Sequence, residues 1–359
     1  MNQRGWQQPL VFNMAITTLE QLEKHLVLTQ EEKSWKPVEI GVPLCITEHY
    51  ISLMNPNDPA DPLRRQVVPT CRENEELQTE SADPLAEVSH SHGERLIHRY
   101  TNRVAFLSTD ICPMYCRHCF RRRFTGNMMG PASEKDINDA ANYIKDKPQI
   151  KEMLLTGGDP LTLSDEQLDA MISVFRKARP DLIIRICTRY PVSQPSRITE
   201  NLISVFTRHN SAPFYLMTQF NHPREITQDS IKAVSMFVDA GIPAFNQSVL
   251  LKGVNDNADV LEELCNRLLL IRVKPYYLFQ GDMVSGTADF RVPLRRGMEI
   301  ERELRTRLSG MGMPNYVADL PDGGGKVPLC GSYILQQPDK EKGSWLFRTP
   351  EGETRILAD

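Results

Sequence analysis

Three cysteines lie within eight residues in the stretch DICPMYCRHCFRRR, residues 110–123. Cys112, Cys116 and Cys119 have the spacing C-x3-C-x2-C. Thiolates so close together are ligands typical of zinc or of an iron–sulfur cluster. A closed zinc site needs a fourth ligand, and His118 is cramped for that role because it adjoins Cys119. Three thiolates on a [4Fe–4S] cluster leave one iron open, as in catalytic sites, so we favour the cluster over zinc.

A second feature is the stretch DLPDGGGKVP, residues 319–328, in which Lys326 follows three glycines. A phosphate-binding P-loop needs Ser or Thr after the lysine, and Val327 and Pro328 exclude that motif. A flexible surface loop is one alternative. The other is a lysine that forms a Schiff base with pyridoxal phosphate, where glycines let the backbone approach the cofactor. By itself the stretch does not decide between these two.

The elements that must position these loops alternate along the chain. Short apolar stretches follow one another at 104–109, 152–157, 182–188, 213–220, 244–251 and 274–280, with amphipathic segments at 164–178, 198–208, 227–240 and 258–271. Near-continuous apolar strands separated by helices indicate βαβ units and a parallel sheet. We therefore predict an α/β fold built as a partial (β/α)6 TIM-type barrel with N- and C-terminal extensions; a doubly wound sheet is the alternative.

Polar and glycine residues gather where the predicted strands end. The active sites of such barrels form at the carboxyl ends of the strands. The residues expected there are the cysteine loop, TGGD (156–159), Thr188 and Arg189, QFNHP (219–223), Asn246 to Ser248 on the fifth strand, and GDMVSG (281–286). The sequence thus predicts one site that combines these loops.

The flanking segments look different. Residues 17–36 are expected to be helical, 55–62 to form turns, and the acidic stretch 72–95 to wrap the surface. We expect an N-terminal extension over 1–97, the barrel over 98–290 and a C-terminal segment with the lysine over 291–359.

Composition narrows the class of protein. The 359-residue chain has a formal net charge of −4, which does not favour a nucleic-acid partner. No apolar stretch approaches the roughly 20 residues of a membrane span, and the N-terminus lacks a signal peptide pattern. The five cysteines outside the loop are scattered, so no disulfide framework is expected. We expect a cytoplasmic protein.

The cysteine spacing directly after the first predicted strand resembles the radical S-adenosylmethionine (SAM) superfamily. In that family the open iron binds the amino and carboxylate groups of SAM, and the reduced cluster cleaves SAM to a 5′-deoxyadenosyl radical. TGGD resembles the motif that meets the methionine end of SAM, which implies Gly157, Gly158 and Asp159 as its contacts. One departure is His118, which stands where an aromatic residue is usual.

The cysteine and lysine loops together closely resemble the lysine 2,3-aminomutase family. The similarity runs from about residue 40 to 335 and includes HRYTNRV, TGGDPL, FNHPREIT, NQSVLLKGVND and KPYYLFQGD. The resemblance implies the following roles: Cys112, Cys116 and Cys119 for the cluster, Lys326 for pyridoxal phosphate, Arg99, Tyr100 and Arg103 around that cofactor's phosphate and ring, Gln247 near SAM, Arg121 for the substrate α-carboxylate, and Asp282 and Asp319 for a distal ammonium.

Two carboxylates would offset the desolvation of a side-chain cation and would repel a glutamate substrate. With both carboxylates retained, the resemblance implies interconversion of L-lysine and L-β-lysine by radical 1,2-amino migration, with an electron from a reduced flavodoxin or ferredoxin-type donor. Alternatives are a lysine of elongation factor P, arginine or another amino acid as substrate, a non-catalytic metal-binding protein, or a pyridoxal enzyme without radicals. A homo-oligomer is left open.

Other positions remain less informative. Arg122 and Arg123 are expected to be solvated or to pair with acidic neighbours, and His222 is either a turn residue or part of a cofactor site. Phe279 stands where the family has a tyrosine, and Asn257 where it has a cysteine. Because the cysteine-rich tail of the longer members is also missing, no interface zinc is expected.

Overall fold

The computed structural model describes residues 15–37, 41–75, 78–339 and 344–358. Its main element is a nine-stranded sheet with the order β11-β10-β9-β8-β7-β6-β5-β4-β3. Strands β4 to β10 are parallel, and β3 and β11 pair antiparallel at the two edges. The strands are β3 Leu96–Tyr100, β4 Arg103–Thr109, β5 Glu152–Gly157, β6 Ile183–Cys187, β7 Phe214–Thr218, β8 Ala244–Leu250, β9 Val273–Gln280, β10 Asn315–Leu320 and β11 Gly325–Pro328.

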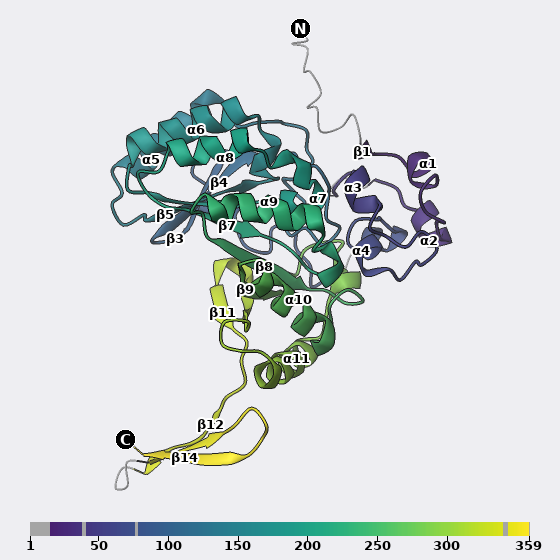
Figure 1. Cartoon of the computed structure of the whole chain (residues 1–359), viewed down its shortest axis with the longest axis vertical. Coiled ribbons are helices and arrows are strands. Elements are labelled where there is room, and N and C mark those ends of the chain that lie inside the picture. Colours follow the sequence, from purple (N-terminus) through teal and green to yellow (C-terminus); the bar gives the residue numbers. More distant parts are fainter. Residues whose placement is uncertain (1–14, 38–40, 76–77, 340–343, 359) are drawn as a thin grey trace.

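Helices connect the parallel strands and cover one side of the curled sheet (Figure 1). They are α5 Glu134–Lys145, α6 Asp165–Ala178, α7 Tyr190–Ser193, α8 Glu200–Arg208, α9 Gln228–Asp239, α10 Ala258–Leu270 and α11 Leu294–Arg307. Ser133, Ser164, Thr199, Thr227 and Asn257 cap α5, α6, α8, α9 and α10 by accepting a hydrogen bond from a first-turn amide, which explains where these helices begin. The predicted α/β fold with six βα units is confirmed.

The edges of the sheet were not predicted. Strand β11 contains Gly325 and ends at Pro328, and both residue types are depleted in strands. It forms because β10 offers a complete pairing edge, with Asp319 opposite Lys326 and Val317 opposite Pro328. Lys326 therefore lies on an edge strand of the barrel sheet, directly after the turn that connects β10 to β11.

The N-terminal region departs from the prediction. A single helix over 17–36 is wrong, because α1 Leu19–Leu22 and α2 Gln30–Lys33 are separate and each begins at its own threonine cap, Thr18 and Thr29. The other short elements are β1 Ala15–Ile16, β2 Ile46–Thr47, α3 Glu48–Ile51 and α4 Pro62–Arg65. The stretch 72–95 does more than wrap the surface, since the side chains of Glu73 and Glu87 are buried.

The C-terminal residues form a separate antiparallel sheet of β12 Ile334–Asp339, β13 Ser344–Arg348 and β14 Thr354–Ala358. It lies at the far end of the molecule from α5 and α6 (Figure 1). The expected division at 97/98 and 290/291 stays a prediction. In the described part of the chain, no helix has the length and apolar character needed to cross a bilayer.

Candidate active site

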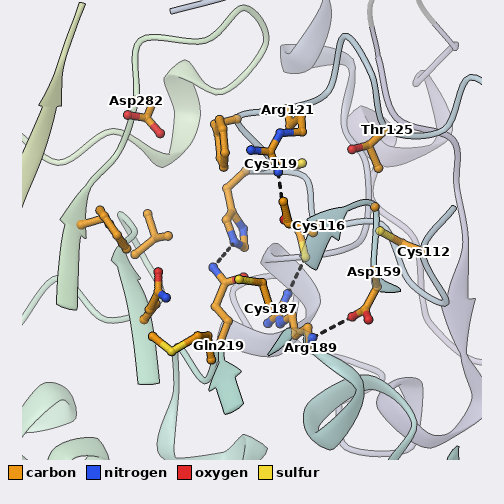
Figure 2. Close-up of a pocket in the computed structure, with 18 of the residues that line it drawn as sticks. Cys112, Cys116, Cys119, Arg121, Thr125, Asp159, Cys187, Arg189, Gln219 and Asp282 are labelled. Atoms are coloured by element: carbon orange, nitrogen blue, oxygen red, sulfur yellow. Dashed lines mark hydrogen bonds between the residues drawn. The ribbon is translucent and has the colours of Figure 1, made fainter. Parts of the chain in front are cut away.

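A cavity of about 350 Å³ lies at the carboxyl ends of the parallel strands. It brings together most residues singled out from the sequence, although they come from positions more than 200 residues apart. Its lining includes Cys112, Cys116, Cys119, Arg121, Gly157, Gly158, Asp159, Gln247, Asp282, Asp319 and Lys326. Figure 2 shows the three cysteines and Asp159 on one side of this space and Asp282 on another.

The two glycines of TGGD fix the cysteine loop against the end of β5. A Cβ atom at Gly158 would collide with the carbonyl oxygen of Ile111, one residue before Cys112. Gly157 has a φ of +117°, and a Cβ atom there would meet the carbonyl oxygen of Thr109. Both positions therefore require glycine for the close approach of two backbones, whatever ligand they contact.

Asp159 organises the next loop rather than facing the cavity as a free acid. Its carboxylate accepts hydrogen bonds from the Thr188 hydroxyl at 2.8 Å and from the Arg189 amide at 2.7 Å. Burial raises the pKa of Asp159 to about 6, and these hydrogen bonds act in the opposite direction. The contacts place Arg189 beside the cysteines.

The three thiols share one wall of the cavity. Burial raises the pKa of Cys112 and of Cys119, whereas the Sγ of Cys116 accepts a hydrogen bond from Nη1 of Arg189 at 2.7 Å. Among the described residues no three His, Cys, Asp or Glu side chains converge on a single ion. Three soft thiolates from one loop, beside a cavity with room for a further ligand, are the donor set of an iron–sulfur cluster with one open iron.

Several buried polar atoms around the cavity have no hydrogen-bond partner among the residues that the structure describes. They are Nδ1 of His118, Oγ1 of Thr125, Nε of Arg189 and Oγ1 of Thr218. Unpaired buried polar groups are costly, and groups of this kind in a cavity are satisfied when a polar ligand binds. The residues present therefore fit a ligand as polar as SAM beside the cysteines.

A second group of lining residues is built around Lys326. Its ammonium pairs with Asp319 and lies 4.2 Å from the centre of the Phe279 ring. Burial lowers the pKa of Lys326, and Asp319 partly offsets that shift. A lysine amine with a lowered pKa in a partly apolar site is suited to bond covalently with a carbonyl cofactor. The hydroxyl expected from the family's tyrosine is missing at Phe279.

Three predicted phosphate- and ring-binding residues lie beside Lys326. Nη2 of Arg99 and the hydroxyl of Tyr100 reach Oδ1 of Asp319 at 3.4 and 3.3 Å. The guanidinium of Arg103 lies 3.6 Å from the centre of the Tyr100 ring. These side chains form a cationic group next to the amine, which fits the phosphate of pyridoxal phosphate. Their individual roles stay predictions.

Asp282 is the second carboxylate at this end. Burial, and after it the nearby charge of Asp319, raise its pKa to about 7, although Lys326 and Arg99 act in the opposite direction. Two carboxylates that repel each other in a partly buried space accommodate a cation well. The site therefore offers negative charge where a substrate side-chain amine would lie.

The arginine run after Cys119 is held by acidic residues of the N-terminal extension. Arg122 pairs with Glu73 at 2.7 Å, and Glu73 also binds Arg117. Arg123 lies 3.4 Å from Asp83. For Arg122 and Arg123 the prediction of acidic partners is confirmed.

Sequence reasoning missed the acidic partners of the run. Glu73 and Glu87 gave no signal, because they lie in a polar stretch without periodicity and far from their arginines along the chain. His222 was left undecided; it accepts a hydrogen bond from the Arg224 amide and lies outside the cavity lining, so it is a turn residue.

Comparison with known proteins agrees with this geometry. The Radical SAM superfamily matches residues 106–264, and the Lysine-2,3-aminomutase family matches residues 300–352. L-lysine 2,3-aminomutase from Clostridium subterminale is 44% identical over 329 residues, which are 90% of this chain and 77% of that protein. The chain belongs to the lysine 2,3-aminomutase family of radical SAM enzymes.

The names of other relatives give either lysine or glutamate as the substrate. An L-lysine 2,3-aminomutase from Acetoanaerobium sticklandii is 44% identical and covers 90% of this chain and 78% of its own. A glutamate 2,3-aminomutase from Clostridioides difficile is 37% identical and covers 96% of this chain and 80% of its own. These matches assign the family, the isomerase class, the iron–sulfur cluster and SAM. The names of the relatives do not decide the substrate by themselves.

Proposed function

We propose that this enzyme interconverts L-lysine and L-β-lysine, with SAM on the cluster of Cys112, Cys116 and Cys119 and pyridoxal phosphate on Lys326. The observation that carries the proposal is the charge distribution in one cavity. Arg121 lines it beside the cysteines, and Asp282 and Asp319 line it at the Lys326 end. This arrangement suits a substrate with a carboxylate at one end and a cation at the other.

When bound, the cluster with SAM supplies a radical that abstracts hydrogen, and pyridoxal phosphate supplies an electron sink for the migrating amino group. The chain supplies placement. Arg121 would hold the α-carboxylate, and Asp282 and Asp319 would hold the distal ammonium, so the carbons between them would lie at a fixed depth. Arg99, Tyr100 and Arg103 would hold the phosphate. Buried side chains such as Met114 and Leu251 line the cavity, which limits the access of water to reactive species.

The same charges argue against glutamate. Its side-chain carboxylate would face two acidic groups, and like charges in a partly buried site repel strongly. Arginine also carries a distal cation, but its guanidinium is longer and bulkier than an ammonium. The substrate best matched by both ends of the cavity is therefore free lysine.

The experiment is an assay of the anaerobically reconstituted enzyme with SAM, pyridoxal phosphate and a chemical reductant. Lysine, arginine, glutamate and elongation factor P are supplied separately, and isomerised products are detected by chromatography and mass spectrometry. Turnover of lysine to β-lysine is expected. Isomerisation of arginine or of the elongation factor lysine, with no product from free lysine, would refute this substrate. A colourless preparation that binds only zinc would refute the radical reaction itself.

A further inference from the structure

Residues 81–91 of the N-terminal extension contact several loops that surround the active site. The Ser81 amide donates to the carbonyl of Met283 at 2.9 Å, next to Asp282. Leu85 lines the cavity, and the ring of His90 lies so close to Gly323 that a Cβ atom there would meet it at 2.9 Å. This segment thus contacts the loop of Asp282 and the loop that leads to Lys326.

Within this segment, Glu87 makes a forked ion pair with Arg121. Nε and Nη2 of Arg121 lie 3.0 and 2.6 Å from the two carboxylate oxygens of Glu87. Nη1 of Arg121 donates to the hydroxyl of Thr156 at 3.0 Å. Both members of the ion pair are buried. Forked, charge-assisted contacts of this type fix the plane of a guanidinium.

Counting donors shows what this pair leaves available. A guanidinium has five N–H groups, of which Glu87 takes two and Thr156 takes one. Within the described part of the chain, one N–H of Nη1 and one N–H of Nη2 remain without an acceptor. That is the number that a carboxylate accepts in a forked contact. Arg121 can therefore hold Glu87 and a ligand carboxylate at the same time.

Glu87 is itself held in place. The carboxylate of Asp83 accepts hydrogen bonds from the amides of Glu87 and Val88 at 3.0 and 2.9 Å. The intervening Ala86 has a φ of +52°, an uncommon conformation for a residue with a Cβ atom. A turn that adopts such a conformation, closed by an acidic side chain, directs the Glu87 carboxylate toward Arg121.

We propose that Glu87 is a positioning residue, which orients Arg121 for the substrate α-carboxylate and balances its charge before substrate binds. This inference rests on the proposed function. The reason for an anchor is electrostatic: Asp282 and Asp319 line the same cavity, and an unanchored guanidinium would be attracted to them. If Arg121 paired with either aspartate, Arg121 could no longer bind the substrate carboxylate and that aspartate could no longer bind the substrate ammonium.

The test replaces Glu87 by glutamine, which keeps its shape and removes its charge. Glu94→Gln, which changes an exposed carboxylate three residues beyond this segment, is the matched control. The wild-type enzyme is assayed with lysine first. If it gives no β-lysine, the proposed function fails, and this result is distinct from a failure of the Glu87 proposal. For Glu87→Gln we expect kcat/KM for lysine to fall roughly 10- to 100-fold, mainly through KM, with the KM for SAM unchanged.

A second readout separates positioning from a general structural role. Binding of lysine and of its α-carboxamide is measured by calorimetry on the loaded enzyme without reductant. Glu87→Gln should weaken lysine and leave the carboxamide unaffected, and Glu87→Asp should recover part of the loss. Equal weakening of both ligands, or unchanged lysine binding, would overturn the proposal. So would loss of the cluster signal in Glu87→Gln together with normal lysine affinity in Glu87→Asp.

Discussion

Lys326 and Asp319 are direct register partners across the antiparallel pair β10–β11, and their side chains form an ion pair. The pairing explains how a loop rich in glycine can place a reactive amine. The two strands fix both backbones, so the ammonium and the carboxylate meet without help from the turn. The carboxylate of Asp319 also binds Arg99 and Tyr100. These contacts connect β10 and β11 to β3 at the opposite edge of the sheet.

We expect Lys326→Ala to abolish turnover and covalent attachment of pyridoxal phosphate. Lys326 lines the cavity, its amine pairs with Asp319, and burial lowers the pKa of that amine. The measurement is borohydride reduction followed by peptide mass spectrometry, which should locate the adduct on Lys326 in the wild type. Lys252→Ala, at an exposed position, is the control and should keep both properties. An adduct on another lysine would contradict this assignment.

Asp282 should make stability depend on pH. Its folded pKa is raised from 3.8 to about 7, so between these values the folded state binds more protons than the unfolded chain. The free energy of unfolding therefore falls as pH rises through this window. In the cofactor-free enzyme, Asp282→Asn should remove this fall and gain roughly 1–3 kcal/mol at pH 8. Urea unfolding at pH 5 and pH 8 measures this difference. The same change in the free energy of unfolding between the two pH values in both proteins would contradict the prediction.

Much of the barrel follows from the sequence because each βα unit carries its own local signals. Apolar strands such as 152–157 and threonine or serine caps such as Ser164 act over short distances. The active-site loops could be placed by one rule, that parallel strands end at a common edge. Lys326 could be placed only by resemblance, because β11 has few features of a strand.

The sequence does not indicate which acidic residues pair with the arginine run. Glu73 and Glu87 meet Arg122 and Arg121 through contacts 49 and 34 residues apart in the chain, and nothing in their local pattern indicates burial. Periodicity reports which side chains face a core, but it does not report which charges meet. The same holds for Arg189, whose contacts with Cys116 and Glu225 depend on the assembled barrel.

Gly158→Ala should disturb the cysteine loop without touching a cysteine. The added Cβ atom would collide with the carbonyl oxygen of Ile111, and backbone on both sides leaves little room to relax. We expect a loss of roughly 1–3 kcal/mol in stability and poorer cluster incorporation. Gly310→Ala, where a Cβ atom meets nothing within 4 Å, is the control. Thermal unfolding measures the stability and iron analysis measures cluster incorporation. A variant with wild-type values for both would show that the two backbones can move apart.

Cys116→Ser should separate the two cofactor sites. The thiol of Cys116 accepts a hydrogen bond from Arg189, whereas Lys326 pairs with Asp319, so the two groups have separate partners. Loss of one of three thiolates should remove the electron paramagnetic resonance signal of the reduced cluster and all turnover. Attachment of pyridoxal phosphate to Lys326 should persist, because its contacts come from β3, β10 and β11. Cys330→Ser, an exposed thiol, is the control and should keep cluster and turnover. Full activity in Cys116→Ser would instead indicate a pyridoxal reaction that needs no radical.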